Sequence, residues 1–269
     1  MINALPRRIR VDALADPAIA VSVGYLLALL IAEIALIGGG LLAGAICQAL
    51  LLLTLLAHRI LVPGASYRAL LSGFALLSVV RLLSMTVPVA GLPVLAWQVM
   101  VGVPAFLAIV LALRAERVDP ELIGFVVPPD AAVVVLSTAA GIPIGLLGWL
   151  ALRPPPMVTA LSPLSVAVAI VVTLVFIVAL QELLFRGVIQ GLALDAIGSS
   201  TVAVGISTAA YTIMLLGSLS APFVILSCAF ALGLGLTVER TGSIWAAVGA
   251  QASATLGMVL VWPLLLGSG

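Results

Sequence analysis

Long apolar runs recur along nearly the whole chain and constrain its fold more than any other feature of the sequence. Individual runs of about 18 to 22 residues are each long enough to cross a bilayer core of roughly 30 Å as a helix. Hydrophobic residues make up 64% of the chain and charged residues only 8%, a composition far from that of soluble domains. The apolarity is unbroken rather than alternating, which excludes the strands of a β-barrel. The predicted fold class is therefore all-α, a polytopic bundle of about eight to nine transmembrane helices.

Clusters of glycine and proline divide the apolar runs into spans. They lie at 38–40, 63–64, 128–129 and 154–156, and such backbone is best placed where water can satisfy its polar groups. The predicted spans are 18–37, 41–57, 69–87, 93–113, 131–152, 164–184, 200–216, 221–238 and 243–265.

The segment 114–130 is the most charged part of the chain and divides it into two halves. We expect a cytoplasmic N-terminus at 1–17, a four-span half at 18–113, a cytoplasmic linker at 114–130 and a five-span half at 131–269. A solvated loop is the first interpretation of the linker, and a docking site for a cytoplasmic partner is the alternative.

The arginines predict how the spans are oriented. All eleven basic residues are arginine, and a cytoplasmic N-terminus places most of them at cytoplasmic span ends, as the positive-inside rule requires. Arg153 is then external and Arg81 lies within a span. The first apolar run lacks a persuasive cleavage site, so we expect it to be retained as a span. The predicted localisation is the plasma membrane, with multiple spans.

Two opposite charges are predicted at similar depth inside the bilayer. Glu33 lies in the outer part of the first span and Arg81 in the outer half of the third. Because neither charge is stable alone in hydrocarbon, an intramembrane ion pair is the first interpretation. Unpaired positions in a wet cavity and a functional site are the alternatives. Small residues four apart predict close helix packing at Gly141/Gly145, Gly187/Gly191 and Gly249/Ser253.

The sequence argues against metal-dependent, nucleotide-binding and nucleic-acid-binding functions. His58 is the single histidine, and Cys47 and Cys228 lie in apolar runs without a CxxC spacing. One histidine cannot build a multi-ligand zinc site, and no nucleotide-binding or hydrolase motif is present. A net charge of +1 argues against nucleic-acid binding. We therefore expect no metal, no cofactor and no nucleic-acid partner.

The stretch Gln181-Glu182-Leu183-Leu184-Phe185-Arg186-Gly187 resembles the first motif, Glu-Glu-x-x-x-Arg, of the CPBP family. This family comprises the type II CAAX prenyl endopeptidases and their bacterial Abi-type relatives. The segment 240–247, Arg-Thr-Gly-Ser-Ile-Trp-Ala-Ala, is similar to the segment that leads into the family's last motif. The resemblance covers residues 120–265, and two motifs in the right order make it fairly specific.

The resemblance implies a catalytic site whose chemical groups this chain has exchanged. In active members the first glutamate of the motif activates water, histidines of the next motifs assist it, and an asparagine stabilises the oxyanion. Here the leading glutamate is replaced by Gln181, whose amide cannot act as a base near neutral pH. The second motif begins at Tyr211. The remaining family positions are occupied by Leu215 and Gln251 in place of histidines, and by Ala254 or Thr255 in place of the asparagine.

Two charged residues of the motif are retained. Glu182 and Arg186 lie four residues apart, the spacing at which an intrahelical ion pair forms. Each lost acid–base group typically contributes about 10²–10⁴ in rate. The substitutions therefore predict a degenerate and catalytically inactive site.

The first functional hypothesis is a non-catalytic CPBP-like membrane protein, an accessory, assembly or regulatory subunit. Its partners would be the bilayer and either another integral membrane protein or a lipid-like ligand held in the inherited cavity. One alternative is an intramembrane CAAX-type endopeptidase that uses Glu182 as its base. Another is a small-molecule or lipid transport component, which Glu33 and Arg81 would serve.

Overall fold

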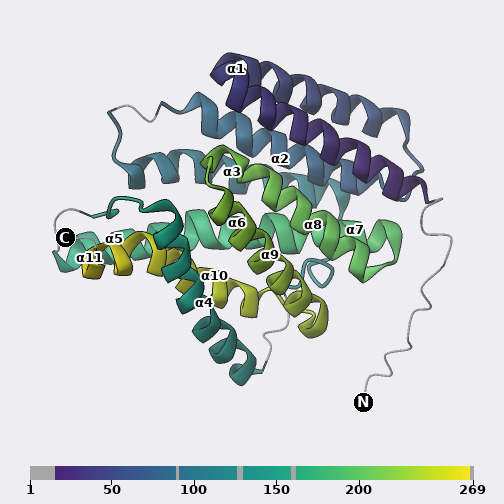
Figure 1. Cartoon of the computed structure of the whole chain (residues 1–269). Helices are drawn as coiled ribbons and strands as arrows, with labels where there is room; N and C mark the ends of the chain where they lie inside the picture. The colour runs from purple at the N-terminus through teal and green to yellow at the C-terminus, as the bar shows by residue number, and fades with distance from the viewer. Residues whose placement is uncertain (1–15, 89–90, 126–129, 159–161, 267–269) are drawn as a thin grey trace.

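The computed structural model describes residues 16–88, 91–125, 130–158 and 162–266, and over these ranges the chain is a bundle of helices without strands (Figure 1). The predicted all-α fold class is confirmed. Arg7, Arg8 and Arg10 of the N-terminal segment and the Pro128-Pro129 break lie outside the described residues. The helices are α1 (Pro17–Leu61), α2 (Arg68–Thr86), α3 (Val94–Glu116), α4 (Ala131–Leu152), α5 (Pro163–Thr173), α6 (Leu180–Glu182), α7 (Gln190–Ile197), α8 (Ser200–Met214), α9 (Ala221–Thr241), α10 (Trp245–Leu256) and α11 (Trp262–Leu266).

Local sequence explains where several helices begin and end. The Asp16 carboxylate accepts a hydrogen bond from the Ala18 amide at 2.8 Å and so caps α1. The Asp130 carboxylate caps α4 in the same way, through the Ala132 amide at 2.9 Å, and such caps satisfy amides that have no intrahelical partner. Gly198 ends α7 in the left-handed region, at φ 72°, where glycine carries no steric penalty.

Helix α1 is a hairpin of two antiparallel helices (Figure 1). Gly40 interrupts it with φ 79° and ψ −176°, a conformation that favours glycine. The Tyr25 hydroxyl hydrogen-bonds His58 Nδ1 at 2.8 Å, although a straight helix would separate these residues by about 50 Å. α1 therefore contains both spans predicted at 18–37 and 41–57. Eight helical stretches in the described residues are long and apolar enough to cross a membrane, with α1 counted once.

The longest straight element is the central helix, which we define as residues 163–197 (Figure 1). It joins α5, α6 and α7 through two π-helical stretches, Leu174–Ala179 and Leu183–Ile189. The helix extends beyond the span predicted at 164–184 and ends at Ile197. The polar residues after 184 resemble an interface in sequence, but Arg186 and Gln190 are buried by protein instead.

The two halves of the chain share one hydrophobic core. The largest buried cluster contains Leu29, Leu71 and Ile109 from the N-terminal half together with Val188 and Ala210 from the C-terminal half. Large apolar side chains cover much of the outer surface of the long helices, as expected where they face lipid. The chain is a multi-pass membrane protein.

Residues 122–124 of the linker pack against the protein. The first interpretation, a solvated loop, therefore does not hold for this part of the linker. Ile123 is buried, and the Gly124 carbonyl accepts a hydrogen bond from the Ile244 amide at 3.0 Å. The Trp245 indole donates to the Phe125 carbonyl at 3.2 Å. An added Cβ at Gly191 would lie 2.7 Å from the Leu122 carbonyl oxygen, so this end of the linker packs on the central helix.

Helices α4 and α10 cross in close contact through the small residues at 141/145 and 249/253. A Cβ added at Gly141 would lie 2.1 Å from Ser253 Oγ and 2.2 Å from the Ala250 carbonyl oxygen. Ser253 Oγ also hydrogen-bonds the Thr138 carbonyl at 2.6 Å. The predicted packing of small residues within one bundle is therefore observed at this crossing.

The crossing yields a stability prediction. We expect Gly141→Ala to lower the free energy of unfolding by about 1–3 kcal/mol, because the α4–α10 backbones cannot separate to admit the methyl group without losing contacts. The matched control is Gly233→Ala, since nothing lies within 4 Å of a Cβ added there. The control should be neutral or stabilising, because alanine favours the helix over glycine. Thermal unfolding in detergent measures both variants, and equal stability of the two would contradict the packing described.

Candidate functional site

Five of the positions singled out by the family motifs meet in one cavity. It has a volume of about 150 Å³ and is lined by side chains from the central helix, α4, α8, α9 and α10. We call it the site cavity. The sequence-predicted residues that line it are Gln181, Tyr211, Leu215, Gln251 and Thr255, and Ala254 lines it as well.

The local backbone near these residues departs from regular α-helix. The π-helical stretch Leu174–Ala179 ends two residues before Gln181. A third one, Gly257–Val261, begins two residues after Thr255. π-Helical turns re-aim side chains and occur frequently at functional sites. Both helices that carry the amides of the site are therefore perturbed beside them.

Neutral polar side chains of the site cavity form hydrogen bonds with one another. Gln251 Nε2 donates to Gln181 Oε1 at 3.2 Å and to Thr255 Oγ1 at 3.3 Å. Both acceptors belong to the positions that the sequence resemblance singled out, with Ala254 as the alternative to Thr255. Ser227 is a lining residue that the sequence analysis did not identify, because no motif marks it. The rest of the wall is largely apolar.

The retained charged residues of the motif lie behind this cavity and do not line it. Arg186 Nη1 approaches Glu182 Oε1 at 3.1 Å, and both side chains are almost completely buried. The Arg186 guanidinium stacks over the Tyr211 ring at 4.7 Å and donates to the Ala231 carbonyl at 3.4 Å. The pair therefore joins the central helix to α8 and α9. Glu182 is 0% exposed, so its carboxylate has no access to a substrate in the cavity.

Two further hydrogen bonds tie the central helix to its neighbours. Ser207 Oγ of α8 donates to the Phe185 carbonyl at 2.7 Å, within the second π-helical stretch. Gln190 Nε2 donates to the Gly235 carbonyl of α9 at 2.9 Å. These contacts satisfy polar groups that hydrocarbon could not, and each unsatisfied group would be costly there.

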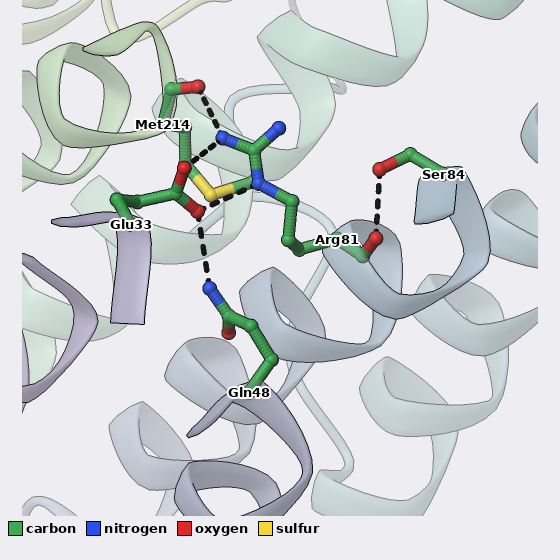
Figure 2. Close-up of polar contacts among 5 residues, drawn as sticks. All are labelled: Glu33, Gln48, Arg81, Ser84 and Met214. Atoms are coloured by element: carbon green, nitrogen blue, oxygen red, sulfur yellow. Dashed lines mark hydrogen bonds and ion pairs between the residues drawn. The ribbon is translucent and has the colours of Figure 1, made fainter. Parts of the chain in front are cut away.

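A second buried polar centre lies in the N-terminal half (Figure 2). Arg81 Nε donates to Glu33 Oε1 at 2.6 Å and Arg81 Nη2 pairs with Glu33 Oε2. Gln48 Nε2 donates to Glu33 Oε1 at 3.0 Å. The structure thus brings the two charges predicted at membrane depth together as a bidentate pair. Gln48 joins them because the α1 hairpin returns it to the level of Glu33.

Arg81 also connects this centre to the C-terminal half. Its Nη2 donates to the Met214 carbonyl at 2.7 Å. Met214 is the last residue of α8, and carbonyls at a helix C-terminus lack intrahelical partners and attract cations. Met214 carried no polar signal in the sequence, since it contributes through its backbone.

Comparison with known families gives one match, which covers the C-terminal half of the chain in part. The family model of type II CAAX prenyl endopeptidase Rce1-like proteins matches residues 163–257. The chain contains an Rce1-like domain. The matched region begins with α5 and includes every candidate site residue except Glu33 and Arg81. The resemblance inferred from the sequence for residues 120–265 is thus confirmed over residues 163–257. No curated protein and no solved structure matches the chain. Among the described residues, no group of three or more His, Cys, Asp or Glu side chains could hold a metal ion.

The buried pair of the Rce1-like domain gives a second prediction. We expect Glu182→Met and Arg186→Met each to destabilise the protein by about 3–5 kcal/mol, because each leaves one uncompensated buried charge. The double variant should recover much of that loss, since apolar residues then replace both charges. Thermal unfolding of all three in detergent measures the coupling.

Arg240→Met is the matched control, because Arg240 is exposed at the end of α9. It should change stability little. Strictly additive losses from Glu182→Met and Arg186→Met would contradict the pairing.

Proposed function

We propose that this chain is a non-catalytic Rce1-like membrane protein that serves as an accessory or regulatory subunit. It holds a membrane partner or a lipid-like ligand at the site cavity. The observation that carries this proposal is that the described residues lining the cavity include no carboxylate and no imidazole. The acid–base groups expected of an active site are replaced by amides, hydroxyls and hydrocarbon.

The chemistry of the lining residues supports binding over catalysis. The amides of Gln181 and Gln251 donate and accept hydrogen bonds but do not exchange protons near neutral pH. The hydroxyls of Ser227 and Thr255 would need an adjacent base to act as nucleophiles. Glu182, the base of the alternative endopeptidase hypothesis, is enclosed behind the cavity and paired with Arg186.

The proposed setting is the plasma membrane, with the N-terminus on the cytoplasmic side. The distribution of arginine supports this orientation, because a cytoplasmic N-terminus leaves Arg153 as the external exception among the loop arginines. Polar side chains such as Gln181 and Gln251 are energetically costly at membrane depth. This cost supports a bound partner or ligand that forms hydrogen bonds with them.

Filling the site cavity tests this function. We expect Ser227→Phe to reduce co-purification of a stoichiometric membrane partner at least about tenfold, because the ring occupies the space that the partner needs. The measurement is affinity purification of the full chain from native membranes, followed by quantification of each retained protein and lipid.

Ile225→Phe on the same helix is the matched control, since Ile225 is 70% exposed on the outer surface. It should retain the partner at the wild-type level. Equal recovery with both variants, or purification of the wild-type chain free of any fixed partner, would overturn the proposal.

A further inference from the structure

A second cavity lies where the two halves of the chain meet. It has a volume of about 300 Å³ and is bounded by α2, α3, the central helix and the end of α8. It adjoins the site cavity, since both are lined by Gln181, Tyr211, Leu215 and Ile177. Arg81 lines only this second cavity, so the ion pair of the N-terminal half borders a space that reaches the degenerate site.

The second cavity is electrically neutral. Arg81 is the only charged residue among the described residues that line it, and Glu33 already compensates its charge through two contacts. An anionic ligand would leave one net negative charge in a medium of low dielectric constant, at a large cost. A cationic ligand would find no free carboxylate. The charge balance therefore favours a neutral ligand.

Polar groups of the second cavity have unused hydrogen-bonding capacity. Gln98 is 7% exposed, and its Oε1 is buried without a hydrogen-bond partner among the described residues. The third nitrogen of the Arg81 guanidinium is Nη1. It has no dashed contact in Figure 2 and forms no hydrogen bond with any described residue. A buried acceptor without a donor is costly and calls for an explanation.

A hydroxyl group has the hydrogen-bonding capacity that these two residues call for. It can donate to Gln98 Oε1 and accept from Arg81 Nη1, whereas an ester or ether oxygen can only accept. Gln181 offers a further donor, because its Oε1 is taken by Gln251 while its amide nitrogen makes no hydrogen bond among the described residues.

The remaining wall of the second cavity suits a hydrocarbon chain. It is formed mainly by apolar side chains, among them Val80, Val101, Phe176 and Leu184. A few polar groups in a mostly apolar concave site are typical of small-molecule sites, whose volumes start near about 300 Å³. A volume at this lower limit favours one acyl chain over two.

We propose that the second cavity binds a neutral single-chain amphiphile with a hydroxyl head group. The head group lies at Arg81 and Gln98, and the acyl chain lies along the apolar wall toward the site cavity. This site includes the N-terminal half and does not depend on the partner proposed for the site cavity.

Direct binding of 1-monooleoylglycerol to the purified full chain in maltoside detergent tests the proposal. We expect saturable binding of about one molecule per chain, at least tenfold tighter than oleate, because the two probes share a tail and differ in head-group charge. Val101→Phe should weaken binding at least tenfold, since Val101 lines only the second cavity. Val103→Phe on the same helix is the control, because Val103 is 52% exposed, and it should bind like the wild type.

A second variant keeps the test decisive if Val101→Phe folds poorly. Gln98→Leu should weaken binding by about three- to tenfold through loss of one hydrogen bond. It should not lower the melting temperature, since it removes an unsatisfied buried oxygen. Substitution of a residue with a purely structural role would not weaken binding while leaving the melting temperature unchanged.

Three results would overturn the proposal: absence of saturable binding, oleate binding as tightly as monooleoylglycerol, or wild-type affinity in Gln98→Leu. Ser227→Phe fills the site cavity alone and should keep amphiphile binding. Failure of the accessory function and failure of this inference are therefore distinguishable.

Discussion

The buried ion pair between Glu182 and Arg186 is the interaction on which the site depends. Either charge alone would be costly in a bilayer, so the two are paired and enclosed, and the Tyr211 ring and the Ala231 carbonyl contact Arg186. Adjacent side chains project about 100° apart on a helix. Once Glu182 faces the protein interior behind the cavity, its neighbour Gln181 faces the cavity. The residue that lines the cavity is thus an amide, and the buried carboxylate pairs with Arg186.

The same constraint couples the two halves of the chain. Glu33 and Arg81 neutralise each other in the N-terminal half, and Arg81 Nη2 also donates to the last carbonyl of α8. This contact lies beside the second cavity, so one guanidinium both joins the Rce1-like domain to the N-terminal helices and lines the space between them. Both residues of this ion pair lie before residue 163, where the match to the Rce1-like family model begins.

The helices and the family could be predicted from the sequence because hydropathy and short motifs are local signals. The positions of Gln181, Tyr211 and Gln251 followed from motif spacing, and the structure brings them to one cavity. Contacts that depend on tertiary geometry could not be predicted. Gln48 meets Glu33 only because Gly40 reverses α1, and Met214 contributes a backbone carbonyl that no residue type reveals. The end of the central helix was missed because buried Arg186 and Gln190 have the sequence signature of an interface.

Our central proposal is that Glu182 has a structural role and that the site cavity, lined by no carboxylate and no imidazole among the described residues, does not support catalysis. Its most direct test is cleavage of a prenylated CAAX peptide by the purified full chain, with wild type and Glu182→Gln compared at equal folded fraction. We expect no cleavage above the protein-free background for either form. Cleavage by the wild type that is abolished in Glu182→Gln would contradict it.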